Sequence, residues 1–178
     1  EPAPHDGTVT RGDDTELVEQ LYQRMEARLT NVVYRWLWNR EDVRDVLQDA
    51  FVRLWQMRER VDWDRAEPLV YRIALNLASK KRRSRRIWKW VALDHTVEPA
   101  GTMVGDGGDG GDREREAFVK QAIDGLPERH RRVLMLSIHS ELSYDQIAEV
   151  LGISAGTVAS RRNSAVAKLR AALARQDR

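Results

Sequence analysis

The sequence predicts an all-α protein made of two small helical domains joined by a flexible linker. Over most of the 178 residues, apolar side chains recur at steps of three and four, which is the period of an amphipathic helix. No segment alternates polar and apolar residues with period two, so no strand is predicted. A Gly/Asp-rich stretch without a period, residues 99–112, separates an N-terminal helical bundle from a C-terminal helix-turn-helix four-helix domain.

The N-terminal domain, residues 15–90, is predicted to contain three helices. Its first helix carries an apolar stripe from Leu17 to Leu37, and its second helix carries an apolar stripe from Val43 to Trp55. The predicted elements are a flexible polar tail at 1–14, helices at 15–38, 41–58 and 69–86, and a loop at 60–68 that holds Trp63.

The linker is predicted at 91–114 and the C-terminal domain at 115–176. The first helix of this domain, 116–125, ends at Gly125, and the next begins with Pro127 at its first position, where the missing N–H costs nothing. Because the Gly/Asp-rich composition behaves as a flexible coil, we expect the two domains to move independently unless a partner holds them.

The second half of the C-terminal domain has the pattern of a helix-turn-helix. Ser143 followed three residues later by Gln146 is a capping box, which starts a helix. Gly152 stands where a tight turn needs a left-handed residue, and Ser154 caps the next helix. A short helix, a glycine-bearing turn and a longer polar helix are the parts of a DNA-reading unit. A plain helical hairpin with Gly152 as its C-cap is the alternative.

Charge is strongly partitioned, although the formal net charge is only +2. Residues 72–90 hold eight positive and no negative side chains, residues 94–116 hold seven acids and two arginines, and residues 158–178 hold six positive side chains and one acid. Basic clusters release counterions when they meet phosphates, so nucleic acid is the predicted partner. Each basic run taken alone is equally well explained as a solvated helix surface.

Composition excludes several other classes of protein. Hydrophobic residues make up 42% of the chain, enough to bury cores, and no apolar run approaches the ~20 residues that span a bilayer. The start of the chain lacks a secretory-signal pattern. The sequence has no cysteine and four scattered histidines, so we expect no disulfide, no cysteine catalysis and no metal site. No cofactor and no catalytic residues are predicted.

Three motifs in order resemble the extracytoplasmic-function (ECF) group of bacterial sigma factors. They are REDVRDVLQDAFVRLW at 40–55, YRIALNLASKKRRSRR at 71–86 and LPERHRRVLMLSIHSELSYDQIAEVLGISAGTVASR at 126–161. The resemblance covers about residues 15–90 and 115–173. It implies a promoter-specificity subunit, not itself an enzyme, that binds core RNA polymerase and directs recognition of the −35 and −10 elements and melting of the latter.

The resemblance also implies three sets of site residues. The core-polymerase-binding set is Asp42, Asp45, Gln48, Asp49 and Phe51. The −10 DNA-binding set is Trp63, Arg72, Asn76, Lys80, Lys81, Arg82 and Arg83. The −35 DNA-binding set is Ser154, Gly156, Thr157, Ser160, Arg161, Asn163 and Lys168.

Some of these residues have a plainer interpretation. Asp42, Asp45 and Asp49 fall on one helix face, which by itself indicates only a solvated acidic surface. The amide of Asn76 can be satisfied within the bundle instead of on an unstacked base. Trp63 can cap the core as well as form the wall of a pocket for an extruded base.

The implied partners are core RNA polymerase, through its β′ clamp helices and β flap, double-stranded and melted promoter DNA, and an anti-sigma factor. Cytoplasmic action and no membrane insertion of its own follow from the same resemblance. Two other functions compete. A regulator with a C-terminal helix-turn-helix and a helical sensor domain would not need the acidic 40–55 stretch. A helical nuclease or phosphohydrolase would hold metal on Asp42, Asp45 and Asp49, but histidine ligands are absent from their neighbourhood.

The sequence departs from the family pattern at several positions. The loop before the third helix reads WDRAEP, and Leu69 stands where Trp is common. In the recognition helix Arg162 replaces a buried Leu, and Asn163 and Ser164 replace a His-Arg pair. Glu141 occupies a place that usually holds Gly.

Overall fold

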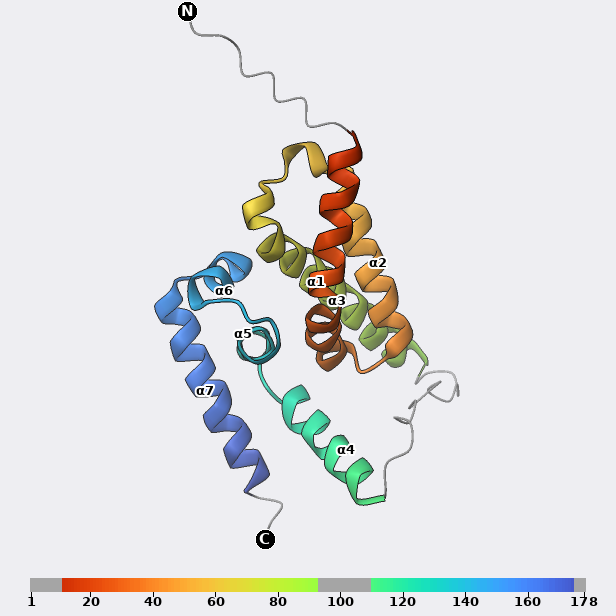
Figure 1. The fold of residues 1–178 in the computed structure, drawn as a ribbon. Helices are drawn as coiled ribbons and strands as arrows, with labels where there is room; N and C mark the ends of the chain where they lie inside the picture. Colours follow the sequence, from red (N-terminus) through yellow and green to blue (C-terminus); the bar gives the residue numbers. More distant parts are fainter. Residues whose placement is uncertain (1–10, 93–109, 175–178) are drawn as a thin grey trace, which may run out of the picture.

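The computed structural model describes residues 11–92 and 110–174. Within these ranges the chain forms seven α-helices and no strand, which confirms the predicted all-α fold (Figure 1). The helices are α1 (Arg11–Leu37), α2 (Arg40–Gln56), α3 (Ala66–Ala92), α4 (Gly110–Asp124), α5 (Glu128–His139), α6 (Tyr144–Leu151) and α7 (Ala155–Leu173). Two short 3₁₀ turns, Arg58–Arg60 and Trp63–Arg65, connect α2 to α3.

Helices α1, α2 and α3 pack against one another around a continuous apolar core. Leu29 of α1, Leu54 of α2 and Leu75 of α3 are each at most 1% exposed, as expected from their place on the apolar stripes. Asn39 caps α2 by accepting a hydrogen bond from the backbone N–H of Asp42. The bundle therefore holds α2 and α3 side by side with their polar faces outward.

Several predicted helix boundaries were wrong, and α3 runs over Ala66–Ala92 instead of the predicted 69–86. Helix α1 begins at Arg11, inside the predicted tail, and α4 begins at Gly110, inside the Gly/Asp-rich stretch that was predicted to lack structure. Once a helix is nucleated, each added residue gains a backbone hydrogen bond, so a helix can extend into a segment whose composition would not start one. Pro127 is the N-cap of α5 and not its first helical residue. The remaining linker residues, 93–109, lie outside the described ranges, as do the predicted tail residues 1–10.

The C-terminal domain contains the predicted helix-turn-helix. Ser143 and Gln146 form the capping box at the start of α6, and Gly152 adopts the left-handed conformation with φ 64° at its end. The side chain of Ser154 accepts a hydrogen bond from the N–H of Thr157 and caps α7. Ile147 of α6 and Val158 of α7 are fully buried, so the two helices share a core with α5.

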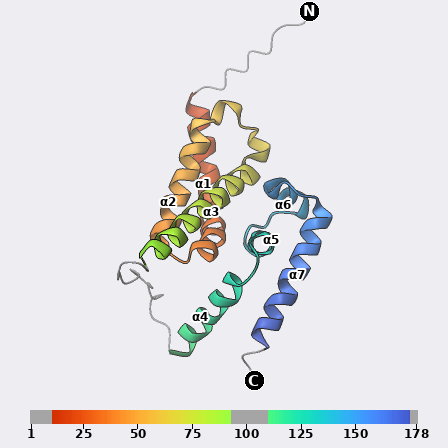
Figure 2. The same ribbon diagram turned by 180° about the vertical axis from the view of Figure 1, so that it is seen from behind.

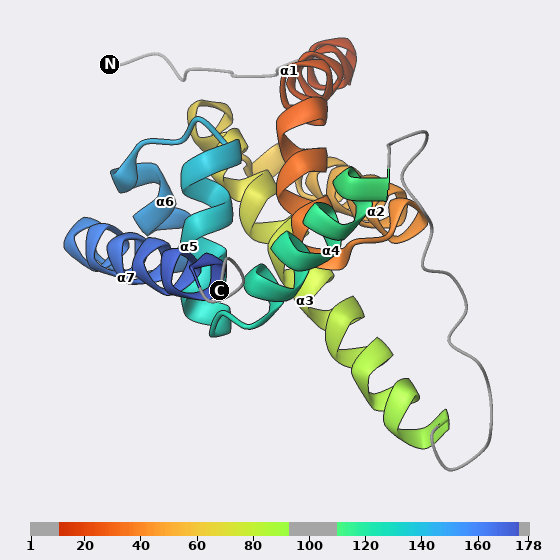
Figure 3. The same cartoon turned by 90° about the horizontal axis from the view of Figure 1, so that it is seen from below.

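The two domains pack together in the structure, although the linker composition led us to expect independent motion. Helix α5 lies against α1, and α6 lies against α3 (Figures 1 and 2). The hydroxyl of Tyr71 on α3 donates to the carbonyl of Ser140, and Arg132 of α5 donates to Ser79 of α3. The C-terminal end of α3 projects away from both domains (Figure 3). The structure therefore shows one arrangement in which the domains are in contact, and their independent motion stays a prediction.

Candidate nucleic-acid interface and docking groove

Helix α7 presents a polar face to solvent. Val158 and Ala165 anchor the helix in the domain core, and the predicted −35 residues lie on its N-cap and its outer sides. Ser154, Gly156, Ser160, Asn163 and Lys168 are exposed, and Thr157, Arg161 and Arg162 are half-buried. The hydroxyls of Ser154 and Thr157 lie 2.8 Å apart, which fixes both side chains at the start of the helix. The arrangement suits a helix that enters a DNA groove with its N-terminal half.

His130 on α5, which the sequence did not single out, lies near positive charges of α5 and α7. Its ring is buried and its Nδ1 has no partner within the described residues. Burial lowers the pKa of His130, and the positive charges of Arg129, Lys168 and Arg161 lower it further. A lone histidine in a helical pattern carries no signal that could have revealed this. The shift indicates that positive charge converges between α5 and α7.

Helix α3 carries a polar stripe on its exposed side. Arg72, Asn76, Lys80 and Arg83 recur at steps of four, four and three residues, and all four are exposed. This spacing places their side chains on one face of the helix. We call these four residues the α3 stripe. It is a continuous row of cationic groups with one amide among them.

Lys81 and Arg82 do not belong to the α3 stripe. Both are half-buried and paired within the protein: Lys81 Nζ lies 2.6 Å from Asp45 Oδ2, and Arg82 Nη2 lies 3.2 Å from Asp124 Oδ1. Burial opposes the charge on Lys81, but hydrogen bonds and the charges of Asp45 and Asp42 outweigh it, so the pKa of Lys81 is raised. The structure thus gives both cations partners inside the protein, which the prediction of phosphate contacts did not foresee.

The predicted acidic face of α2 is only partly exposed. Asp45, Gln48 and Asp49 face solvent, whereas Asp42 is 6% exposed and Phe51 is 8% exposed. Asp42 is covered because α3 crosses the first turn of α2 and brings Lys81 to 3.1 Å and Arg85 to 2.6 Å from its carboxylate. Phe51 instead packs edge-on against Tyr22 of α1, with ring centroids 5.0 Å apart. Asp42 and Phe51 are therefore much less accessible than the other three residues of the predicted core-polymerase-binding set.

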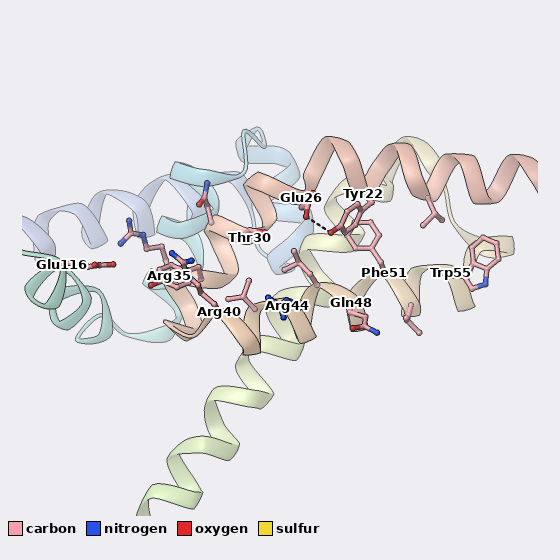
Figure 4. A pocket seen from close by; sticks show the side chains of 16 residues that line it. Tyr22, Glu26, Thr30, Arg35, Arg40, Arg44, Gln48, Phe51, Trp55 and Glu116 are labelled. Carbon is pink, nitrogen blue, oxygen red and sulfur yellow. Dashed lines mark hydrogen bonds between the residues drawn. The ribbon is translucent and has the colours of Figure 1, made fainter. Parts of the chain in front are cut away.

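A groove of about 1000 Å³ runs between α1 and α2 beside this face (Figure 4). Tyr22, Phe51 and Trp55 line one end, and Arg35, Arg40 and Arg44 line the other; Gln48 borders it from the acidic face. The hydroxyl of Tyr22 donates to Glu26 at 2.7 Å, and this hydrogen bond, with burial, raises the pKa of Tyr22. The groove could not be predicted from the sequence, because its shape depends on how two amphipathic helices pack against each other.

The remaining predicted residues have mainly structural surroundings. Trp63 is half-buried and packs against the core, as the core-capping interpretation expected. Trp36 is 1% exposed, and Trp38 is packed against the core.

In the described part of the chain, no three acidic or histidine side chains come together in a way that could hold a metal ion. Nor does any described helix have the length and apolar character to cross a membrane.

The fold and these surfaces define an all-helical protein with a DNA-reading helix-turn-helix, and comparison with known proteins defines its family. Residues 21–87 match the family described as Sigma-70 region 2, and residues 122–171 match Sigma-70, region 4. The ECF RNA polymerase sigma factor SigL of Mycobacterium tuberculosis is 30% identical over 164 residues, which cover 90% of each chain. The chain belongs to the ECF sigma factors, which direct promoter-specific transcription initiation.

Solved structures have the same fold. CnrH, in a complex with the cytosolic domain of CnrY, is 25% identical, with a TM-score of 0.65 over 90% of this chain and 94% of that one. The sigma factor RpoE in complex with the anti-sigma factor NepR from Bartonella quintana is 18% identical, with a TM-score of 0.63 over 92% of this chain and 98% of that one.

Proposed function

We propose that this sigma factor divides its work among three surfaces on two domains, 15–90 and 115–176. The exposed side chains Asp45, Gln48 and Asp49 of α2 bind core RNA polymerase at its β′ clamp helices. The α3 stripe binds the −10 element and helps to melt it. The exposed side of α7 reads the −35 element.

The α3 stripe is the observation that carries this assignment. Four exposed side chains lie in register over three turns of one helix, so they can follow a single nucleic-acid strand. Arg72, Lys80 and Arg83 would neutralise phosphates, which positions DNA without reading its sequence. The amide of Asn76 can donate to and accept from an unstacked base edge, which is the reading step that melting requires.

The −35 role rests on the residues around the start of α7. Arg161 follows Thr157 by one helical turn, so both side chains can enter one groove. An arginine there can pair bidentately with a guanine edge, whereas Lys168, about four turns from the N-cap, is placed for phosphate.

The proposed partners follow from these surfaces. Core polymerase would contact the acidic part of α2 and the neighbouring groove through its clamp helices, and the C-terminal domain through its β flap. The complex of RpoE with NepR supports an anti-sigma factor as a further partner. We place the protein in the cytoplasm, where polymerase acts, and assign it no catalysis of its own.

Charge reversal on α2 tests the polymerase contact. Asp49→Lys changes a side chain for which the described part of the structure gives no ion pair, and Asp45→Lys with Asp49→Lys reverses both exposed carboxylates. We expect each variant to bind core polymerase more weakly than wild type, most clearly at low salt because screening weakens exposed charges. Asp64→Lys, an exposed acid in the loop before α3, is the matched control. Equal affinity of wild type and both α2 variants for core at low salt would contradict the assignment.

A further inference from the structure

Glu141 connects α5 to α6 in a conformation that its residue type disfavours. Its backbone φ is 59°, in the left-handed region where an L side chain is strained and glycine is not. The resemblance to the family also predicts glycine at this position. Because this backbone conformation is unfavourable for glutamate, we expect a side-chain contact that offsets its cost.

That contact crosses between the two domains. Oε2 of Glu141 lies 2.7 Å from Nη1 of Arg28 on α1, in the N-terminal domain. Arg28 is held in place by its own domain, because its Nη2 donates to the carbonyl of Arg24 and lies 3.5 Å from Glu67 of α3. The Arg28 guanidinium is thus already oriented by its own domain. The left-handed turn at Glu141 directs the glutamate side chain toward this guanidinium.

The same interface occupies basic groups of α3. Nη2 of Arg72 donates to the backbone carbonyl of Glu149 on α6, and Arg82 pairs with Asp124 of α4 at 3.2 Å. Arg65, just before α3, lies 3.8 Å from the Glu149 carboxylate. Carbonyl and carboxylate oxygens of the C-terminal domain therefore stand where phosphate oxygens would stand on these arginines.

The packed arrangement also covers part of α3. In the structure α6 lies directly against α3, and α5 lies against α1 (Figure 2). Because Arg72 is hydrogen-bonded to α6, the whole α3 stripe becomes available to DNA only when the two domains separate.

We propose that Glu141 stabilises a closed form of the free sigma factor, in which its ion pair with Arg28 holds the C-terminal domain over α3 and keeps Arg72 of the α3 stripe from promoter phosphates. This inference rests on the proposed role of the α3 stripe. The competitor of DNA is part of the same chain, because carboxylate and carbonyl oxygens of the C-terminal domain bind the arginines that DNA would bind.

Interdomain fluorescence energy transfer in the full chain tests the closed form without DNA. The chain has no cysteine, so Gln56→Cys on α2 and Ala167→Cys on α7, both exposed, give a specific dye pair. Glu141→Gln removes the charge, and Glu141→Gly removes the side chain while relieving the backbone. Because an exposed ion pair is worth up to about fivefold in an equilibrium, each should lower the closed-to-open ratio about two- to fivefold.

Matched variants separate the effect of the Glu141 ion pair from a general charge effect. Asp145→Asn removes an acid four residues away, for which the described residues give no ion pair, and should leave the ratio unchanged. In an Arg28→Gln background, Glu141→Gln should have no further effect. The inference is overturned if Glu141→Gln matches Asp145→Asn, or if its effect is as large without Arg28 as with it.

DNA binding completes the test. Glu141→Gln should raise the affinity of the free chain for promoter duplex by the same factor by which it opens the domains. A lower closed-to-open ratio without a gain in affinity would overturn the masking of Arg72. Transcription by wild-type chain with core polymerase, measured in parallel, tests the proposed function by itself, because it does not depend on the energy-transfer result.

Discussion

Replacing Asp42 by Asn should destabilise the N-terminal bundle far more than the same change at Asp45, although both carboxylates pair with Lys81. The side chain of Asp42 is 8% exposed and that of Asp45 is 62% exposed. Asp42 also lies 2.6 Å from Arg85, so its carboxylate joins two cations of α3 to the first turn of α2. The structure therefore assigns the two aspartates different roles on one helix.

The magnitude follows from burial. Losing charged partners at a buried carboxylate costs about 1.5–3 kcal/mol, and the partly exposed Lys81 and Arg85 can regain water, so we expect a loss of about 2 kcal/mol for Asp42→Asn. Asp45→Asn breaks a solvated pair, for which the stability change should be close to the error of measurement. Asn keeps the shape of Asp in both cases, so packing is unchanged.

Urea unfolding measures the difference. Tryptophan fluorescence follows the N-terminal bundle, since Trp36, Trp38 and Trp55 all belong to it, and circular dichroism follows total helix. The free energy of unfolding should fall clearly for Asp42→Asn and stay near wild type for Asp45→Asn, with equal urea dependence. Equal losses in the two variants, or no loss at Asp42, would refute the reasoning from burial.

Three further outcomes are expected. Gly152→Ala should lower the free energy of unfolding by about 1 kcal/mol, because an added Cβ meets nothing within 4 Å and only the left-handed φ of 64° opposes it; unchanged stability in urea would show that the turn adapts. Burial, then the charge of Arg35, lowers the pKa of His139, so the unfolded chain binds more protons and stability should fall as the pH drops below about 6.5. His139→Gln should flatten that pH dependence, and an unaltered profile would contradict it. Lys168→Ala should weaken −35 duplex binding evenly across sequences and reduce the salt slope by about 1, and a sequence-specific loss would show a base contact instead.

Much of the fold follows from the sequence because apolar periodicity and caps act locally. The capping box at Ser143, the left-handed Gly152 and the Ser154 cap each satisfy backbone groups within a few residues, so neighbouring sequence suffices to predict them. Helix ends are harder to predict. Whether α4 begins at Gly110 or later depends on a balance of small propagation energies that composition does not resolve.

The exposure of a candidate site residue can be predicted from sequence only where its own helix determines it and no other helix covers the residue. Helix spacing explains why the four residues of the α3 stripe share one face, but the family resemblance, and not spacing, selected them for the −10 set. The burial of Asp42 could not be predicted from the spacing of α2, because residues of α3 cover it. The same helix crossing makes Lys81 half-buried. The interdomain contact between Arg28 and Glu141 joins residues 113 positions apart, and the sequence analysis did not predict it.

Promoter profiling of two single variants tests the central claim, that α3 serves the −10 element and α7 the −35 element. Wild type, Asn76→Ala and Arg161→Ala are each combined with core RNA polymerase and a promoter library randomised at both elements, and the transcripts are sequenced. Arg161→Ala should relax one or two positions of the −35 element alone, by the ~1–3 kcal/mol of a bidentate base contact. Asn76→Ala should relax only −10 positions. Unchanged preferences in both variants, or a change at the opposite element in either, would contradict the account.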